Sequence, residues 1–187
     1  RLRGPQKAIQ RLLLHELFHV LSRHRPDLRD TLYGTIGYQP VEGFTFPPEL
    51  EGRRLTNPDA PTIEHAIRVR IDSELQWVLP ILIADQDRYD PERGGPFFAY
   101  LKLRFLVVDR DPSSRMARPM RDHRGLRLEP MEALEGFIEQ VGENTGYLLH
   151  PEETLADHFV AWALKDPELP SPDPIDALDQ VFKDALR

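Results

Sequence analysis

Two histidines and a glutamate lie in the middle of an apolar stretch near the start of the chain, in the sequence HELFH from His15 to His19. The surrounding residues predict a helix from about Pro5 to His24. On a helix, His15 and His19 project from one face about one turn apart, close enough to bind one metal ion. Glu16 lies about 100° around the helix axis, where its carboxylate can take a proton from a water molecule on that metal. The HExxH spacing therefore predicts a metal centre that activates water.

The helix that carries this motif is apolar in nearly every direction. Its apolar residues are Ile9, Leu12, Leu13, Leu14, Leu17, Phe18, Val20 and Leu21. We therefore expect most of its circumference to be buried. Buried imidazoles and a buried carboxylate need partners, which the rest of the chain must supply. The alternative to a metal site is a core cluster in which the histidines and the glutamate are satisfied by hydrogen bonds alone.

A catalytic zinc site needs a third protein ligand and one open position. The chain has no cysteine, so the ligands must be His, Asp or Glu. The metzincin extension HExxHxxGxxH is absent, because Ser22 and Arg25 occupy the positions of its glycine and third histidine. Better candidates lie far downstream in PEETLADHF, where Glu153 and Asp157 are four residues apart and share one helix face. The alternatives for the third ligand are His150, Asp157 and His158.

The motifs HELFH and ETLAD together resemble those of the gluzincin zinc metallopeptidases, the thermolysin-like group, in which HExxH is followed by ExxxD. The resemblance covers the two motif helices. It implies that His15, His19 and Glu153 bind one Zn²⁺ ion. It also implies that Glu16 is the general base and that Asp157 orients a ligand histidine from the second shell.

Hydrolysis of an amide also needs a donor that stabilises the oxyanion. His150 stands at the expected start of the helix that carries Glu153, and Tyr147 comes just before it. These two residues are the nearest donors in sequence to a proposed ligand, and with Glu16 they complete the candidate catalytic residues. The alternatives are that His150 caps the helix and that Tyr147 only packs.

Further helices are expected on either side of the middle of the chain. They are predicted after Pro26, where Leu28, Leu32 and Ile36 recur every four residues; over 131–141, ending at Gly142; from Pro151 onward; and in the last segment, which carries Ile175, Leu178, Val181, Phe182 and Ala185. The opening helix, with Pro5, and the helix from Pro151 both have proline in the first turn, where its missing N–H has no intrahelical partner to lose, and Pro26 is expected to end the opening helix.

The middle of the chain has the pattern of antiparallel strands. Residues 67–71 and 101–107 alternate apolar and basic side chains, which is typical of half-buried strands. Between them, residues 75–84 form a continuous apolar run whose Pro80 favours an edge position. We expect either 75–84 or 97–108 to align the backbone of a substrate as an edge strand.

These patterns predict the fold class α+β, with one domain spanning residues 1–187. The resemblance implies a zincin-like arrangement in which the motif helices pack with a small antiparallel sheet. The β-rich segment, at about 61–110, is then an insertion between the two motif helices.

Composition narrows the choice of partners. The net charge of −7 and the pI near 5.5 argue against a nucleic-acid partner. No apolar run approaches the length of a membrane span, and the first ten residues lack the layout of a secretory signal. We expect a soluble chain, either cytoplasmic or exported with its signal removed, that acts on a peptide or protein substrate. The alternatives are an amidohydrolase acting on a non-protein amide and a non-catalytic binding module stabilised by zinc.

Overall fold

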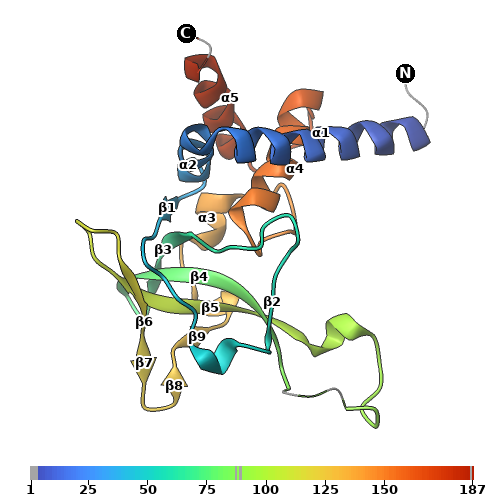
Figure 1. Cartoon of the computed structure of the whole chain (residues 1–187). Coiled ribbons are helices and arrows are strands. Elements are labelled where there is room, and N and C mark those ends of the chain that lie inside the picture. Colours follow the sequence, from blue (N-terminus) through green and yellow to red (C-terminus); the bar gives the residue numbers. More distant parts are fainter. Residues whose placement is uncertain (1–3, 87, 89, 186) are drawn as a thin grey trace. The chain divides into compact units, whose positions relative to one another are not determined.

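The computed structural model describes residues 4–86, 88, 90–185 and 187 (Figure 1). Over these residues the chain is α+β, with five α-helices and a curled antiparallel sheet that forms half of a barrel. The chain divides into two compact units. Residues 1–39 and 137–187 make up the helical unit, and residues 40–136 make up the sheet unit. The single domain predicted from the sequence stays a prediction.

The helical unit contains all five α-helices. They are α1 (Gly4–His24), α2 (Pro26–Gly34), α3 (Phe137–Val141), α4 (Pro151–Leu164) and α5 (Asp173–Ala185). Helix α4 packs against α1, α2 and α5, and α2 also packs against α1 and α5. The predicted helices at the start of the chain, after Pro26, from Pro151 and at the end are confirmed. Helix α4 is thus held between the helix that carries HELFH and the last helix of the chain.

The surface of α1 differs from the sequence prediction. Its residues Phe18, His19 and Ser22 are buried. Five of its apolar residues are each more than half exposed: Ile9, Leu12, Leu13, Leu17 and Val20. The prediction that most of the helix circumference is buried is therefore wrong. Within the helical unit α1 packs on α2 and α4, and these neighbours cover one side of it.

The helix predicted over 131–141 is interrupted. A short 3-10 helix spans Met131–Ala133, and α3 begins only at Phe137. Gly136 lies between them with φ of 82°, a left-handed conformation that ends one helical segment before the next begins. The predicted C-terminal glycine is confirmed, because Gly142 has φ of 79° and its N–H donates to the carbonyl of Ile138 at 2.8 Å.

The strands are short except for three in the centre of the sheet. They are β1 (Tyr38–Pro40), at the boundary between the units, β2 (Arg54–Leu55), β3 (His65–Ile71), β4 (Glu74–Ala84), β5 (Leu101–Arg110), β6 (Ala117–Pro119), β7 (Arg121–Asp122), β8 (Gly125–Leu126) and β9 (Leu128–Glu129). In the sheet unit the order is β3-β4-β5-β6, with β2 beside β4 and β9 beside β5, while β7 and β8 form a separate pair. The strands predicted from alternation at 67–71 and 101–107 are confirmed as β3 and β5.

The prediction that Pro80 marks an edge strand is wrong. Strand β4 pairs with β5 along one side and with β3 and then β2 along the other. Pairing with β3 stops at Val78, and pairing with β2 begins only at Leu82. Pro80 lies in the gap between these two partners, where its missing N–H takes no bond away from either. Strand β5 pairs with β4 along one side, and β9 and β6 flank its other side from Phe105 to Arg110, whereas the pairs given for residues 101–104 are with β4 alone. An edge-strand role for this part of β5 stays a prediction.

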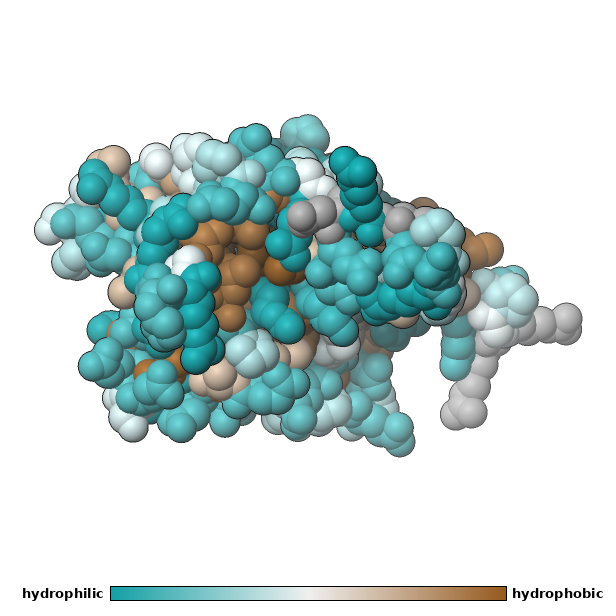
Figure 2. Space-filling model, turned by 90° about the horizontal axis from the view of Figure 1, so that it is seen from below, coloured by the Kyte–Doolittle hydropathy of each residue, from teal (hydrophilic) through white to brown (hydrophobic). Residues whose placement is uncertain are grey.

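The core of the sheet unit consists of apolar side chains from the strands and the segments that cross them. Its buried members are Val41, Leu50, Ala66, Leu79, Ile81, Ile83, Leu106, Val108 and Ala117. Figure 2 shows one face of the molecule on which apolar residues lie in a hollow surrounded by hydrophilic ones. The sheet unit extends beyond the predicted insertion, because its strands begin at Arg54 and continue to Glu129. The zincin-like packing of the motif helices with this sheet stays a prediction. No helix among the described residues is both long and apolar enough to span a membrane.

Candidate metal centre

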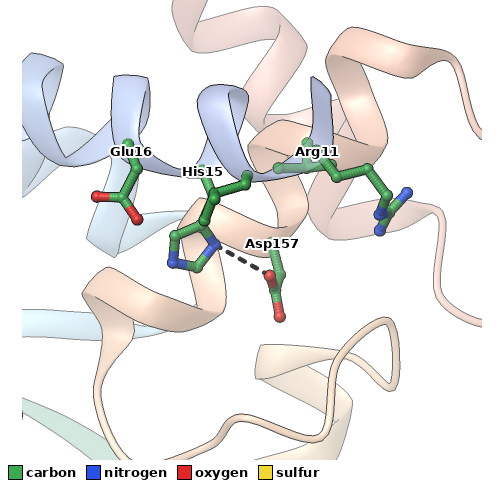
Figure 3. A pocket seen from close by; sticks show the side chains of 6 residues that line it. Arg11, His15, Glu16 and Asp157 are labelled. Atoms are coloured by element: carbon green, nitrogen blue, oxygen red, sulfur yellow. Dashed lines mark hydrogen bonds and ion pairs between the residues drawn. The ribbon is translucent and has the colours of Figure 1, made fainter. Parts of the chain in front are cut away.

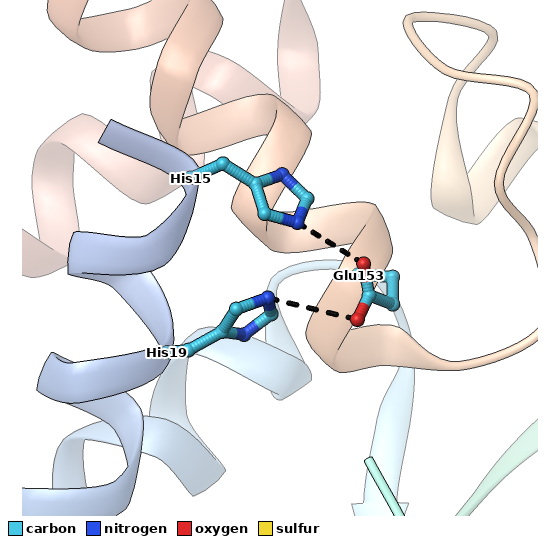
Figure 4. A group of neighbouring side chains, drawn as sticks. All are labelled: His15, His19 and Glu153. Atoms are coloured by element: carbon cyan, nitrogen blue, oxygen red, sulfur yellow. Dashed lines mark hydrogen bonds and ion pairs between the residues drawn. The ribbon is translucent and has the colours of Figure 1, made fainter. Parts of the chain in front are cut away.

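The structure brings His15, His19 and Glu153 together within the helical unit. Both histidines project from α1 toward Glu153 on α4 (Figure 4). His15 Nε2 lies 3.1 Å from Glu153 Oε2, and His19 Nε2 lies 3.6 Å from Glu153 Oε1. One ligand atom from each residue can be chosen so that all three lie within 4.8 Å of one another. Both histidines face the same glutamate because residues four apart in the HExxH motif share one side of a helix.

The other nitrogen of each ring faces a different carboxylate. His15 Nδ1 lies 3.2 Å from Asp157 Oδ1, and His19 Nδ1 lies 2.8 Å from Glu152 Oε1. A carboxylate accepts a hydrogen bond, so a proton on Nδ1 would be donated to these carboxylates, although His15 Nε2, which lies 3.1 Å from Glu153 Oε2, is also placed to donate to a carboxylate. With a metal ion bound at Nε2, the proton of each ring would be on Nδ1. In that tautomer the lone pair is on Nε2, which is the nitrogen that faces Glu153 in both rings. Histidine ligands of metals are usually held in this way.

Asp157 is supported by the loop before α4. Thr145 Oγ1 donates to Asp157 Oδ2 at 2.5 Å, and the same Thr145 oxygen accepts from the backbone N–H of Tyr147 at 3.0 Å. The Asp157 side chain is 38% exposed, and that of its partner His15 is 23% exposed. This half of the site therefore lies at the surface of the helical unit.

Glu152 is buried and accepts hydrogen bonds from three side chains. Besides His19, its donors are Ser22 Oγ at 2.5 Å and the hydroxyl of Tyr33. Burial acts to raise the pKa of this carboxyl, but the hydrogen bonds from His19, Ser22 and Tyr33 outweigh it and leave the pKa below its usual value. Glu152 is therefore an anion inside the protein. Burial and the nearby Glu152 charge raise the pKa of Tyr33, so its hydroxyl stays protonated and donates.

The start of α4 is fixed by His150. This residue has extended backbone angles and its Nδ1 accepts the backbone N–H of Glu152 at 3.1 Å, which is the geometry of an N-cap. Pro151 follows in the first turn. The structure thus shows His150 as the cap of α4. Glu152 and Glu153 both lie in the first turn of this helix, where Glu152 faces His19 Nδ1 and Glu153 faces His19 Nε2.

Glu16 lies in a cavity beside His15. The cavity has a volume of about 270 Å³ and is lined by Arg11, Leu12, His15, Glu16, Asp157 and Val160. Figure 3 shows the side chains of His15 and Glu16 on the same side of α1. Glu16 is exposed. A carboxylate in this position can exchange protons with water or with a molecule that enters the cavity.

The donor set fits a catalytic zinc ion. Zinc in hydrolytic sites is held by three side chains such as two histidines and a glutamate, and keeps its fourth position open. Ligand atoms about 2.1 Å from a tetrahedral ion lie roughly 3.4 Å from one another. The two distances to Glu153, 3.1 Å and 3.6 Å, end on different oxygens of this carboxylate, and one ligand atom from each of the three residues can be chosen so that all lie within 4.8 Å of one another, so the ligand atoms would draw closer together around an ion. The residues present can therefore hold the ion with small adjustments of their side chains.

Tyr147 and His158 are the remaining candidates. Tyr147 is half-buried, and its backbone carbonyl accepts from Thr154 Oγ1 at 2.8 Å. Neither Tyr147 nor His150 lines the cavity that contains Glu16. His158 is five residues after Glu153, so the two side chains point to different sides of α4. Among the described residues, the group that could hold a metal ion is His15, His19 and Glu153, while Asp157 lies at the Nδ1 atom of His15.

His158 has an unusual environment of its own. It is fully buried, and neither ring nitrogen has a hydrogen-bond partner among the described residues. Burial lowers its pKa from 6.5 to about 4. Between these two pH values the unfolded chain binds a proton at this residue that the folded chain does not. The free energy of unfolding therefore decreases as the pH falls from 6.5 to 4. The expected loss is about 3 kcal/mol.

The substitution His158→Leu should remove this pH dependence. We expect the free energy of unfolding of the variant, minus that of wild type, to increase as the pH falls from 7.5 to 4.5, because leucine takes up no proton. Urea unfolding at several pH values in the presence of EDTA measures this difference without a contribution from bound metal. The matched control is His24→Leu, at the exposed end of α1. A difference that is constant over the pH range, or the same in the control, would contradict the prediction.

The sequence did not reveal the three residues around the Nδ1 side of His19, which are Glu152, Ser22 and Tyr33. Glu152 was not among the candidate site residues, and Ser22 entered only as a departure from the metzincin motif. One signal was present: Glu152 lies about 100° from Glu153 on the helix, next to the face that Glu153 shares with Asp157. Ser22 likewise lies three residues after His19, on the same side of α1. Tyr33 gave no such signal, because its position depends on how α2 packs.

The relation to known proteins was tested by comparison with family models, curated proteins and solved structures. None of the three comparisons found a match to this chain.

Proposed function

We propose that this chain is a zinc-dependent peptidase. What supports the proposal most is that two histidines direct Nε2 at one glutamate while the Nδ1 atom of each lies within hydrogen-bond distance of a separate carboxylate. Two histidines and a glutamate are a catalytic zinc set, and carboxylates that hold the far side of the rings are typical of its surroundings. Ordinary core histidines need one partner each and have no reason to converge in this way.

The roles of the residues follow from their positions. His15, His19 and Glu153 would hold the ion, which when bound would polarise the scissile carbonyl and make a water molecule more acidic. Glu16 would take a proton from that water and pass it to the leaving amine. Asp157 would keep His15 oriented. Leu12 and Val160, which line the same cavity, would contact apolar parts of the substrate beside the reacting carbonyl.

The location of Glu16 favours catalysis over a purely structural zinc site. A structural site is closed by four protein ligands. Here the group of ligands found among the described residues has three members, and the cavity with Glu16 adjoins one of them. Whether the substrate is a peptide or another amide depends on what the cavity can accommodate, and hydrolysis assays with both kinds of substrate distinguish the two possibilities.

The proposal is tested on the purified chain by elemental mass spectrometry and by hydrolysis of labelled casein, of a set of fluorogenic peptides and of a set of small non-peptide amides. We expect one zinc ion per chain, activity that EDTA abolishes, and recovery when Zn²⁺ is added back. Zinc binding with hydrolysis only of small non-peptide amides would replace the peptidase by an amidohydrolase. Zinc binding without hydrolysis would favour the binding module. A chain that takes up no zinc would overturn the proposal.

A further inference from the structure

The two carboxylates that hold the histidines have different surroundings. The side chains of His19 and Glu152 are 1% and 5% exposed, whereas those of His15 and Asp157 are 23% and 38% exposed. The bond between His19 and Glu152 is also the shorter one, at 2.8 Å against 3.2 Å. Hydrogen bonds to an ionised group are stronger away from water, because the surrounding dielectric is lower.

The Glu152 carboxylate, on α4, is itself fixed by donors from two other helices. Its Oε1 atom accepts from His19 and Ser22 of α1, and its Oε2 atom accepts from Tyr33 of α2. Glu152 begins α4, where the cap from His150 holds its backbone N–H. With both oxygens bound, the carboxylate has little freedom to turn away from the His19 ring.

We propose that Glu152 is the main positioning residue of this metal centre. Held by Tyr33 and Ser22, it keeps His19 in the tautomer that has its lone pair on Nε2, and it does so before any metal binds. His19 is then the fixed ligand, and His15, with its exposed partner Asp157, is the adjustable one. The role in metal binding rests on the proposed function, but the tautomer of the His19 ring can be measured without it. The resemblance to gluzincins implied a positioning role for Asp157 and none for Glu152.

The inference predicts a ranking of zinc affinities. Glu152→Gln keeps the shape of the side chain and removes its charge, and we expect it to weaken zinc binding by about 10- to 100-fold, the range found when partners of ligand histidines are lost. Asp157→Asn makes the same chemical change at the exposed partner, and we expect a smaller loss. Tyr33→Phe and Ser22→Ala, which each remove one donor to Glu152, should also weaken binding. Glu168→Gln, an exposed carboxylate on the same unit, is the matched control and should bind zinc as wild type does.

The experiment combines zinc affinity, measured by competition with a chromophoric chelator, with nitrogen-15 NMR of the histidine rings in the metal-free chain. In wild type we expect His19 to show one neutral tautomer, with the proton on Nδ1. Glu152→Ala should show both tautomers, a change that a merely structural loss of packing would not produce selectively at His19. Tyr33→Phe provides the test if the Glu152 variants do not fold.

Three results would decide against the inference. These are a His19 ring with mixed tautomers in wild type, a Glu152→Ala variant with an unchanged His19 ring, and an Asp157→Asn variant that loses as much zinc affinity as Glu152→Gln. Failure of wild type to bind zinc is a different outcome, because it overturns the proposed function while the NMR measurement still shows whether Glu152 orients His19.

Discussion

The substitution Glu16→Gln is expected to abolish most hydrolysis while leaving zinc bound. Glutamine has the same size but cannot accept a proton from water, and general acid–base groups contribute about 10²- to 10⁴-fold to the rates of the reactions they serve. Because Glu16 lies beside the ligand group and outside it, the zinc content should stay at the wild-type level. The measurement is kcat/KM on a fluorogenic peptide, with the zinc content determined on the same sample.

The control for this experiment is Glu139→Gln, which makes the same change at an exposed position on α3. We expect wild-type activity from it. If Glu16→Gln retained more than a tenth of the wild-type kcat/KM, another group would have to accept the proton. If instead it lost zinc together with activity, Glu16 would have to contribute to metal binding, and its assignment as a base would fail.

The second large effect is expected at Glu153. Replacing it by alanine removes one of three ligands, and replacing it by glutamine removes the charge of that ligand. Loss of a ligand should exceed the 10- to 100-fold reductions found for groups that only support ligands, so we expect zinc affinity to fall by at least about 100-fold in both variants. Hydrolysis at limiting zinc should fall in parallel. The measurement is zinc affinity by chelator competition together with metal content after dialysis.

The Glu153 variants also separate zinc binding from folding. His15 and His19 pack against α4 through Glu153, so its replacement will change the stability of the metal-free chain as well. Far-ultraviolet circular dichroism shows whether the helices are retained. A folded Glu153→Ala variant that keeps zinc at full affinity would exclude Glu153 as a ligand and would return the question to Asp157.

The sequence predicted the members of the metal group but not all that holds them. The spacing of His15 and His19 fixes their common face by helix geometry alone, and the same holds for Glu153 and Asp157. That the two faces meet was implied by the resemblance of the motifs. The contribution of Tyr33 depends on the packing of α2, which no short-range pattern encodes.

The errors about the fold have a similar origin. The apolar residues of α1 predicted burial on all sides, but burial depends on whether a neighbour covers each side, and Leu13 remains 63% exposed. Pro80 was assigned to an edge because a proline cannot donate to a neighbouring strand. In the structure, the neighbour of β4 on one side changes from β3 to β2 at Pro80, so no hydrogen bond to either strand is lost there. This change of partner is a property of the sheet and not of the residues around Pro80.

The order of the units along the chain gives a bound ion a second effect. The sheet unit, residues 40–136, is inserted between the helices that carry the ligands, and His15 and Glu153 are 138 residues apart. An ion held by both would close a loop of that length, as a disulfide does. In the chain-entropy model, such a closure lowers the entropy of the unfolded chain by an amount worth about 4 to 5 kcal/mol at 25 °C. Cleavage of the backbone within the sheet unit would then leave two fragments that are still linked through the ion.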